Sequence, residues 1–282
     1  MLLNEVKVRK IVELALTEDV GRADLTSSIV EGERAEAEIV AKEEGVVSGT
    51  LPARLTFELL DCEVDVLVED GERIQPGDIV LKAYGEATAL LAAERVALNF
   101  LMRLSGIATA TRKVVERVRE VNPDVIVAAT RKVHPITGFL EKKAVSDGGG
   151  DLHRFGLDDA VLIKDNHLAL VGSVRDAVRR ARERVGFTKV IGVEVESIED
   201  AVEAAKAGAD HVLLDNMKPA EIRRAVNEVR KVREDVILEA SGGITPENAP
   251  EYAETGVDVI SLGWLTHSAP ALDLSMRVRR MT

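Results

Sequence analysis

A series of short, continuously apolar runs in the second half of the chain constrains the fold more than any other feature. Continuous rather than alternating apolar residues are typical of parallel strands that are covered on both faces. Segments with helical spacing separate the runs, and capping-box residues at Ser173–Asp176 and Ser197–Asp200 mark two helix starts. The pattern therefore predicts repeated strand–helix units. The runs are Val125–Ala129, Ala160–Ile163, Val190–Val195, His211–Leu214, Val236–Ala240 and Val257–Ser261.

About six strand–helix units are fewer than a complete eight-stranded barrel contains. We therefore expect an incomplete α/β barrel, with an open doubly wound sheet as the structural alternative. A further helix is predicted to begin at Thr245-Pro246, because threonine is a good N-cap and proline suits the first helical position.

The first half of the chain has a different pattern. Helical spacing predicts an opening helix over Leu3–Leu16, followed by a polar, turn-rich segment. Short β-branched runs separated by Gly, Pro and Asp turns predict an antiparallel sheet within Ala35–Glu86. Two helical stretches follow, Ala89–Gly106 and Thr109–Val121. Ala271–Arg280 also has helical spacing, and we expect it to pack on the first half.

Charge and composition exclude several classes of protein. The net charge of −12 argues against a nucleic-acid-binding surface, although a local basic pocket remains compatible with an anionic substrate. The single cysteine, Cys62, lies in an apolar stretch and is interpreted as an inert packing residue in a reducing compartment. Charges recur through Met1–Thr17, so no signal peptide is predicted. No apolar run is long enough to span a membrane, and we expect a cytoplasmic protein.

The ends of the predicted strands carry the residues most suited to chemistry, because barrel enzymes bind substrates at the C-terminal face. Early ends are basic and suit carboxylates or a pyrophosphate. Middle ends are acidic and suit sugar hydroxyls or magnesium, and late ends are glycine-rich and suit a phosphate. A substrate with a phosphate, a sugar and a second anionic part fits this order. The strand-end groups are Thr130, Arg131 and Lys132; Lys164, Asp165, Asn166 and His167; Glu194 and Glu196; Asp215, Asn216 and Met217; Ser241, Gly242 and Gly243; Ser261, Leu262 and Gly263.

Two further groups of polar residues lie outside the strand ends. His153 and Arg154 follow the run Gly148–Gly150, and the planar guanidinium of Arg154 is suited to a carboxylate. Arg95 and Arg103 lie on the helical stretch that precedes the predicted barrel.

Several strings of residues resemble the signatures of quinolinate phosphoribosyltransferases. The longest and most specific runs from Arg154 to His167, RFGLDDAVLIKDNH. The matches follow the order of the family over nearly the whole chain. The other matching strings are Glu18–Gly21, Asp24–Ser27, Gly45–Gly49, Glu94–Phe100, Leu104–Thr109, Leu214–Met217, Glu239–Ile244 and Thr266–Ser268.

The resemblance implies a fold, an assembly and a reaction. It implies an N-terminal mixed α/β sandwich domain, residues 1–105, joined by a C-terminal helix, residues 269–282. The incomplete α/β barrel would occupy residues 106–268. A homodimer or larger assembly is implied, in which Arg95 enters the active site of the partner subunit. The implied reaction transfers the phosphoribosyl group of phosphoribosyl pyrophosphate to quinolinate with decarboxylation, a step of de novo NAD biosynthesis.

The resemblance also implies roles for individual residues. Lys132, Glu194 and Asp215 would be catalytic and would hold phosphoribosyl pyrophosphate with its Mg²⁺. No His or Cys spacing typical of a dedicated metal site occurs. The quinolinate carboxylates would be held by Arg95, Arg131, His153, Arg154 and Lys164, with Thr130 beside them. The 5′-phosphate would lie against Ser241, Gly242, Gly243, Leu262, Gly263 and Trp264.

The chain departs from the family pattern after Lys132. The family usually continues with two threonines, Pro-Gly, an apolar residue and an arginine, whereas Gly138 stands here at the arginine position. Leu152 replaces a common asparagine, and Ala129 replaces a common aspartate. The loop Val133–Gly138 is therefore expected to differ, and His134 is expected to substitute in part for the missing anion contact.

Structural interpretations stand beside these functional ones. Arg95 can pair with Glu94, and Lys164 can pair with Asp165 or Asp215. Glu194 and Glu196 point to the same side of a strand, and Glu194 is predicted to be the functional one. His167 and His267 are interpreted as structural residues. Trp264 is interpreted either as a packing residue or as a lid on the phosphate.

Three other functions compete with this interpretation. A barrel aldolase or isomerase would use Lys164 as a Schiff-base lysine. A phosphoribosyltransferase-like relative found with molybdenum transport genes would lack the string Ile-Lys-Asp-Asn-His, which is present at Ile163–His167. A lipoyl or biotin carrier would use the glycine turns of Glu69–Gly85, but the carrier lysine is missing and the barrel would be unexplained.

Overall fold

The computed structural model describes residues 3–281, which form two compact units. Unit 1 contains the chain up to Arg112, the segment Val133–Gly149 and the chain from Ser268 onwards. Unit 2 contains Lys113–Lys132 and Gly150–His267. Unit 1 thus extends beyond the predicted range of 1–105 and takes a segment out of the predicted range of 106–268. Residues 1, 2 and 282, which the predicted ranges include, lie outside the described residues.

An antiparallel sheet forms the base of unit 1, as the alternating runs predict. Its strand order is β12-β1-β5-β3, and β1 lies between two partners along nearly its whole length. The short strands β2 and β4 form a separate two-stranded antiparallel ribbon. The strands of unit 1 are β1 (Arg34–Ala41), β2 (Gly45–Val46), β3 (Glu63–Val66), β4 (Arg73–Ile74), β5 (Ile79–Glu86) and β12 (Leu274–Arg280).

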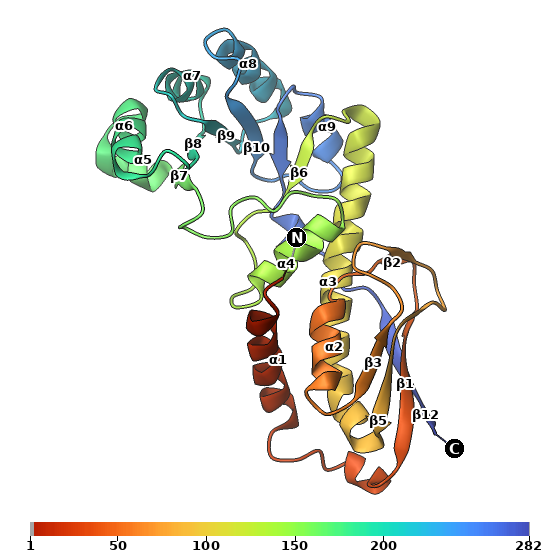
Figure 1. Ribbon diagram of the computed structural model, residues 1–282. Helices are drawn as coiled ribbons and strands as arrows, with labels where there is room; N and C mark the ends of the chain where they lie inside the picture. Colours follow the sequence, from red (N-terminus) through yellow and green to blue (C-terminus); the bar gives the residue numbers. More distant parts are fainter. Residues whose placement is uncertain (1–2, 282) are drawn as a thin grey trace. The chain divides into compact units, whose positions relative to one another are not determined.

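Helices α2 and α3 lie along one face of this sheet, and α1 lies beside α2 (Figure 1). The layer between helices and sheet is mainly apolar, with Ile39, Phe57, Leu81 and Leu101 completely buried. Burial of such side chains stabilises a domain by roughly 1.5–3 kcal/mol each. The helical elements of unit 1 are α1 (Glu5–Val20), the 3₁₀ turn η1 (Ser27–Val30), α2 (Thr50–Glu58), α3 (Ala87–Val121) and α4 (Gly138–Asp147).

Three sequence predictions for unit 1 are wrong. Helix α2 interrupts the segment that was predicted to be sheet alone. Pro52 is compatible with this helix because it lies in the first turn, where a proline costs no hydrogen bond. The two predicted helices after residue 88 form one helix, α3, in which Gly106 fits against the backbone of Pro270. The C-terminal segment predicted as a helix, residues 269–282, contains the strand β12, which pairs with β1. Its apolar residues Leu274, Met276 and Val278 alternate with polar ones, which is the period of a strand.

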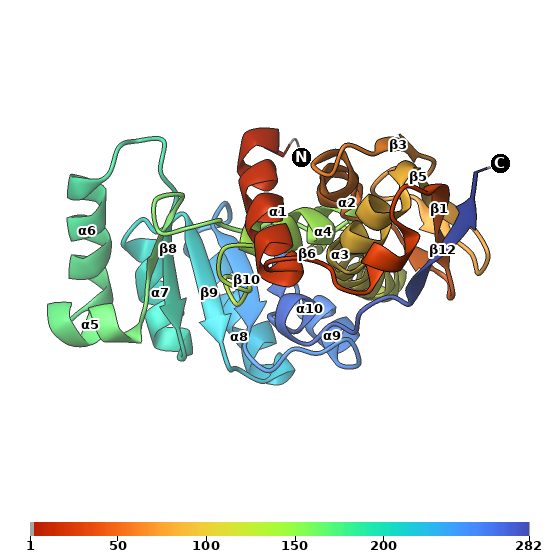
Figure 2. The ribbon, with the colours of Figure 1, turned by 90° about the horizontal axis from the view of Figure 1, so that it is seen from below.

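Unit 2 is built on a six-stranded parallel sheet, and all six predicted strands are present. The strand order is β6-β11-β10-β9-β8-β7. Each strand from β7 to β10 pairs with the next one in sequence, and the last strand, β11, pairs with the first, β6, as in a barrel. β6 and β7, at the two ends, share no ladder in residues 3–281, so the barrel stays open between them. A doubly wound sheet would reverse its order at the centre, and this one does not. Strands β8, β9 and β10 can be followed in succession in Figure 2. The strands are β6 (Ile126–Ala128), β7 (Val161–Ile163), β8 (Ile191–Val195), β9 (His211–Asp215), β10 (Ile237–Ser241) and β11 (Val259–Ser261).

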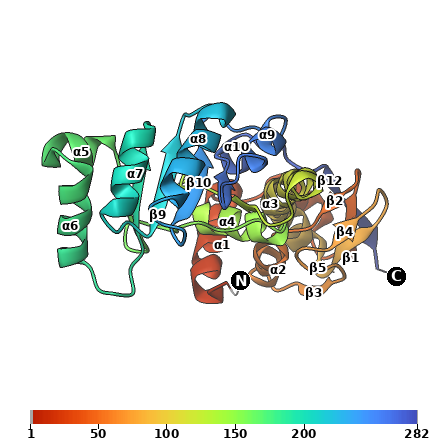
Figure 3. The same ribbon diagram turned by 90° about the horizontal axis from the view of Figure 1, so that it is seen from above.

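Helices follow the strands of unit 2, and α6, α7 and α8 lie in succession beside them (Figure 3). The predicted N-caps are confirmed, since Ser173 Oγ accepts from Asp176 N and Ser197 Oγ accepts from Asp200 N, both at 3.1 Å. The helix predicted from Thr245-Pro246 is α9, which begins three residues later because Asn248 occupies the cap position and binds Thr245 N at 2.8 Å. The helices are α5 (Asp165–Val171), α6 (Val174–Arg184), α7 (Ile198–Lys206), α8 (Pro219–Arg230), α9 (Ala249–Ala253) and α10 (Trp264–His267).

Among the helices of residues 3–281, none combines the length and the apolar character that crossing a membrane requires. The longest of them, α3, carries charged residues along its length.

Candidate active site

A cavity of about 320 Å³ lies within unit 2, and polar side chains dominate its wall. Most of them come from strand ends. In a parallel sheet the C-terminal ends of all strands meet at one edge, which is why residues far apart in sequence share this wall. The lining residues are Thr130, Arg131, Lys132, His153, Arg154, Leu162, Lys164, Glu194, Leu213, Asp215, Glu239, Ser241 and Ser261.

Cationic residues on one part of the wall create a site for an anion. Burial lowers the pKa of Arg154, and the positive charge of Arg131 lowers it further. Two guanidinium groups therefore lie close enough to repel each other, which favours a ligand that brings negative charge between them. The Arg154 Nη1 donates to Ala160 O at 2.9 Å, which fixes the direction of that side chain.

Lys164 forms an ion pair with Glu194 across the adjacent strands β7 and β8. The predicted ion pair of Lys164 is therefore present, but its partner is Glu194 and not Asp165 or Asp215. A Schiff-base lysine needs a free amine to attack a carbonyl carbon, whereas the Lys164 amine is engaged by the Glu194 carboxylate. The ion pair argues against the aldolase alternative.

Glu194 and Asp215 supply the acidic part of the wall. Burial raises the pKa of Asp215, and the negative charge of Glu194 raises it further, while Lys164 opposes the effect. Glu196, two residues along, is exposed and is not part of the cavity wall. Glu194, the residue of this pair that was predicted to be functional, is the one that lines the cavity, and its function stays a prediction.

Lys132 reaches the cavity from the end of β6 and is held by its main chain. Thr266 Oγ1 donates to Lys132 O at 2.7 Å, and Lys132 N donates to Thr130 Oγ1 at 3.1 Å. The aliphatic part of the side chain passes over Gly263, where a Cβ atom would leave it too little space. The lysine is therefore placed beside the glycine-containing loop after β11.

The loops predicted to bind a phosphate follow β10 and β11. Ser241 and Ser261 line the cavity and their hydroxyl groups are 3.0 Å apart. The side chain of Leu262 is fully buried, and its N–H donates to Ala128 O at 3.0 Å. Trp264 begins the short helix α10 and is only partly exposed. Phosphate binding by these loops stays a prediction.

A buried carboxylate that the sequence analysis did not single out lies beneath His153. Glu239, in β10, is 2% exposed, and its Oε2 is 3.1 Å from Nε2 of His153 and 2.8 Å from Nε2 of His211. Burial raises the pKa of Glu239, but the contacts with His153 and His211 outweigh it and hold the pKa below its usual range. A charged residue inside the apolar run Val236–Ala240 was the available sequence signal.

Arg95 lies in unit 1, on helix α3, and is not part of the cavity wall. Its side chain is 57% exposed, and its Nη2 is 3.9 Å from Glu94 Oε1. The predicted pairing with Glu94 is thus present, but at a distance and exposure that hold the side chain only weakly.

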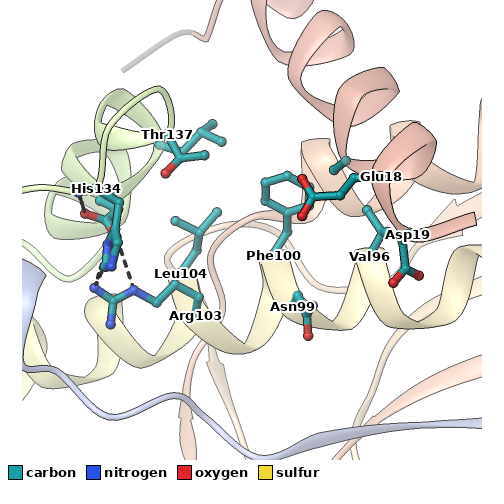
Figure 4. Close-up of a pocket in the computed structure, with 12 residues that line it drawn as sticks. Glu18, Asp19, Val96, Asn99, Phe100, Arg103, Leu104, His134 and Thr137 are labelled. Carbon is teal, nitrogen blue, oxygen red and sulfur yellow. Dashed lines mark hydrogen bonds and ion pairs between the residues drawn. The ribbon is translucent and has the colours of Figure 1, made fainter. Parts of the chain in front are cut away.

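Unit 1 has a pocket of its own, of about 480 Å³, between α1, α3 and the segment before α4 (Figure 4). Arg103 and His134 lie at one end of it, and Glu18 and Asp19 lie at the other (Figure 4). The buried Glu141 accepts hydrogen bonds from Arg103 Nε and Nη2, both at 3.1 Å, and from His134 N at 3.0 Å.

The loop after Lys132 is shaped by the same carboxylate. The Nδ1 atom of His134 is 2.6 Å from Glu141 Oε1. Ile136 has a φ of 69°, in the left-handed region that branched residues rarely adopt. His134 is thus engaged by a carboxylate of unit 1, and its expected role as a substitute anion contact stays a prediction.

Comparison with known protein families covers nearly the whole chain. Residues 24–105 match the N-terminal domain of quinolinate phosphoribosyl transferase, and residues 107–277 match its C-terminal domain.

Individual relatives agree with the family match. A protein of Methanothermobacter thermautotrophicus named probable carboxylating nicotinate-nucleotide pyrophosphorylase is 49% identical over 95% of this chain and 98% of its own length. The human protein of the same enzyme name is 39% identical over 99% of this chain and 94% of its own.

A solved structure agrees as well. This chain is similar to the crystal structure of NadC from Streptococcus pyogenes, with 38% sequence identity and a TM-score of 0.93. The match covers 100% of this chain and 100% of that chain. Together these matches cover both units of the fold. This chain belongs to the quinolinate phosphoribosyl transferase family.

Proposed function

We propose that the cavity of unit 2 is where this chain transfers the phosphoribosyl group of phosphoribosyl pyrophosphate to quinolinate, giving nicotinate mononucleotide, pyrophosphate and carbon dioxide. The observation that carries the proposal is the division of one wall into a cationic and an acidic part. Arg131, Arg154 and Lys164 provide the first, and Glu194 and Asp215 the second. The family match supplies the reaction, a step of de novo NAD biosynthesis.

The cationic part is proposed to hold the two carboxylates of quinolinate. Arg131 and Arg154 repel each other without a ligand, so a dianion between them removes an unfavourable interaction. A guanidinium binds a carboxylate with two parallel hydrogen bonds, which fixes the plane of the pyridine ring. Lys164 contributes a further positive charge, and the ring of His153 forms the adjoining wall. Nicotinate lacks the second carboxylate and would leave buried cations unpaired, so it should be rejected.

Arg95 is proposed to complete the quinolinate site from the partner subunit of a homodimer or larger assembly. Its exposure and weak pairing leave the guanidinium available. Mixing an Arg95→Ala variant with a Lys132→Ala variant tests this proposal. Exchange of subunits should restore part of the activity that both variants lack, because each mixed dimer then has one complete site. No recovery after demonstrated exchange would mean that Arg95 acts within its own chain or not at all.

The acidic part is proposed to hold the ribose and the metal that accompanies phosphoribosyl pyrophosphate. In residues 3–281 no group of three or more His, Cys, Asp or Glu side chains could enclose a metal ion. Mg²⁺ does not need such a group, since it keeps several waters and binds through one or two carboxylates plus substrate phosphates. The repulsion between Glu194 and Asp215 fits a divalent cation, which would supply charge neutralisation for the pyrophosphate when bound.

The residues of the chain then assist a reaction in which little covalent help is needed. Lys132 stabilises the negative charge that grows on the departing pyrophosphate, and Glu194 and Asp215 stabilise positive charge on the ribose ring while fixing its hydroxyls. The pyridine nitrogen attacks ribose C1 and becomes positively charged. Loss of carbon dioxide from C2 leaves an electron pair that this adjacent cation stabilises. Positioning of the two substrates alone contributes up to about 7–11 kcal/mol.

The 5′-phosphate is proposed to lie against Ser241, Gly242 and Gly243 after β10 and Leu262, Gly263 and Trp264 after β11. Lys132 lies against Gly263, which links the phosphate loops to the proposed catalytic lysine. A cytoplasmic location is also proposed, and the buried free thiol of Cys62 is compatible with a reducing compartment.

The proposed function is tested by incubating the purified chain with quinolinate, phosphoribosyl pyrophosphate and Mg²⁺ at moderate and high temperature. Nicotinate mononucleotide should form, and replacement of quinolinate by nicotinate should abolish it. A folded protein that forms no nucleotide from quinolinate would contradict the proposal, and the altered loop Val133–Gly138 would then be the first segment to examine.

A further inference from the structure

Glu239 is anchored to the cavity wall through the ring of His153. Its carboxylate is 2% exposed, and Oε2 lies 3.1 Å from Nε2 of His153. The Nε2 atom of His211 is 2.8 Å from the same oxygen, but at an angle outside hydrogen-bond geometry. The other oxygen, Oε1, is buried without a hydrogen-bond partner among the described residues. Within residues 3–281, the contact with His153 is therefore the one well-directed hydrogen bond of this carboxylate.

The hydrogen bonds of His153 determine its tautomer. Arg154 N donates to Nδ1 of His153 at 2.7 Å, so Nδ1 cannot carry a hydrogen. The proton must then lie on Nε2, where it points at Glu239 Oε2. Both ring nitrogens are thus engaged within the protein. In this arrangement His153 links a buried carboxylate to the main chain at Arg154.

The linked segment has a backbone conformation that needs such support. His153 has a φ of 53°, in the left-handed region that few residues other than glycine adopt. A third hydrogen bond, from His153 N to Asp151 Oδ1 at 2.7 Å, holds the same turn. The next residue, Arg154, begins its side chain from this turn and points a guanidinium into the cavity wall. The ring of His153 thus holds the main chain from which the Arg154 side chain starts, and the bond from Nη1 to Ala160 O holds the far end of that side chain.

We propose that Glu239 is a positioning residue, which holds the His153 ring as the Nε2–H tautomer and so fixes the turn that directs Arg154 toward quinolinate. The inference rests on the proposed function, in which Arg154 binds a quinolinate carboxylate. Glu239 does not touch the reacting atoms. Its anionic form, which the contacts with His153 and His211 stabilise, provides the acceptor that the tautomer requires.

A double-mutant cycle between Glu239 and His153 tests this dependence. Glu239→Gln removes the anion, and its amide must either turn its NH₂ group toward His153 or leave it buried without an acceptor. The variant should raise the KM for quinolinate roughly 10- to 100-fold, the range for lost orienting partners of metal-bound histidines. The KM for phosphoribosyl pyrophosphate should change little. In a His153→Phe background the same substitution should have almost no further effect, because the two residues act as a unit.

A matched control separates positioning from stability. Glu38, in β1 of unit 1, is also a buried carboxylate, and its Oε1 pairs with Lys82 Nζ at 2.8 Å. Glu38→Gln should lower the melting temperature and leave the KM for quinolinate unchanged. If Glu239→Gln behaves in the same way, or if its effect adds fully to that of His153→Phe, Glu239 is structural and the proposal is wrong.

A second readout does not need a variant of Glu239 that folds. In wild-type protein with ¹⁵N-labelled histidine, the chemical shifts of His153 at neutral pH should show an unprotonated Nδ1 and a protonated Nε2. His153→Asn identifies the signal by its loss. A proton on Nδ1 of His153 would overturn the proposal. Wild-type protein that forms no nucleotide would instead remove the proposed function and this inference with it, whereas an active wild type with additive losses removes the inference alone.

Discussion

Asp215 in β9 and Glu194 in β8 lie on adjacent parallel strands, close enough for their negative charges to repel each other. Burial raises the pKa of Asp215, and Glu194 adds to the effect. An acid whose pKa is raised on folding favours the folded state at acidic pH. That contribution is lost as the pH rises through the folded-state pKa. At neutral pH the ionised carboxylate therefore destabilises the fold, as expected for a group that is retained for function.

Asp215→Asn should separate activity from stability. The variant should lose roughly 10²- to 10³-fold in kcat, the cost of removing one electrostatic partner of a transition state. Its melting temperature should exceed that of the wild type at neutral pH. The difference should shrink as the pH falls through the raised pKa of the folded state toward the ordinary Asp value of 3.8. Thermal melts at several pH values, beside steady-state kinetics, measure both quantities.

Asp258→Asn is the matched control for that experiment. The Asp258 carboxylate accepts hydrogen bonds from Arg230 Nη2 and Leu238 N, both at 2.7 Å. Its loss should lower the melting temperature while kcat stays unchanged. An Asp215→Asn variant that melts below the wild type at neutral pH would show that the carboxylate is a structural ion partner.

Arg154→Ala should damage quinolinate binding far more than folding. Burial and the charge of Arg131 lower the pKa of Arg154, so its positive charge is unfavourable in the folded chain without a ligand. Loss of charge-assisted hydrogen bonds worth about 1.5–3 kcal/mol predicts a rise of roughly 10- to 100-fold in the KM for quinolinate. Kinetics and thermal melts on the same preparation give the comparison. Lys164→Ala should show the same separation.

Arg233→Ala serves as the control, because Arg233 is also partly buried and hydrogen-bonded but is not part of the cavity wall. Its Nη1 donates to Ala209 O at 2.6 Å, and its Nε donates to Asp235 at 2.8 Å. The substitution should lower the melting temperature and leave the KM unchanged. Parallel losses of stability and activity in the Arg154 variant would mean that Arg154 is structural.

Gly192→Ala should destabilise unit 2, because Gly192 faces His211 across the pair β8–β9. A Cβ atom at position 192 would lie 2.7 Å from His211 Nδ1 and 3.1 Å from a methyl carbon of Leu162. Overpacking of this kind costs about 1–3 kcal/mol, which chemical denaturation measures. His211→Ala should reduce that cost when the two substitutions are combined.

The exposed Gly186 supplies the control for Gly192, since nothing lies within 4 Å of a Cβ atom built there. Gly186→Ala should leave the free energy of unfolding nearly unchanged. If Gly192→Ala is equally harmless, the close packing of His211 against β8 is wrong.

The C-terminal strand provides a fourth prediction. Leu274, 4% exposed, belongs to the core of unit 1, whereas the Arg279 side chain is 71% exposed on the same strand. Leu274→Ala should lower the free energy of unfolding by about 2–5 kcal/mol. Arg279→Ala should change it by less than about 0.5 kcal/mol. A small effect at Leu274 would mean that β12 does not cover the edge of β1 in solution.

The parallel strands of unit 2 and the residues at their ends could be predicted from the sequence, because both follow from local patterns. A continuous apolar run is visible without knowledge of its neighbours, and the parallel sheet then brings Lys164, Glu194 and Asp215 to one edge. The two helix N-caps at Ser173 and Ser197 were predictable for the same reason.

The wrong predictions concern segments whose structure depends on distant partners. β12 is a strand because β1 offers it an edge, and α3 passes through Gly106 without a break because Pro270 packs there. Glu239 was missed because its role depends on His153 and His211, which lie 86 and 28 residues away in sequence and meet only in the folded barrel. Arg95 poses the same problem at the level of assembly, since its proposed site belongs to another subunit.

The most direct test of the central claim uses quinolinate labelled with ¹⁴C in the carboxylate at C2. In the presence of phosphoribosyl pyrophosphate and Mg²⁺, labelled carbon dioxide and pyrophosphate should be released in equal amounts as nicotinate mononucleotide forms. No label should be released when phosphoribosyl pyrophosphate is omitted. Pyrophosphate release without labelled carbon dioxide, or no release of either from folded protein, would contradict the account.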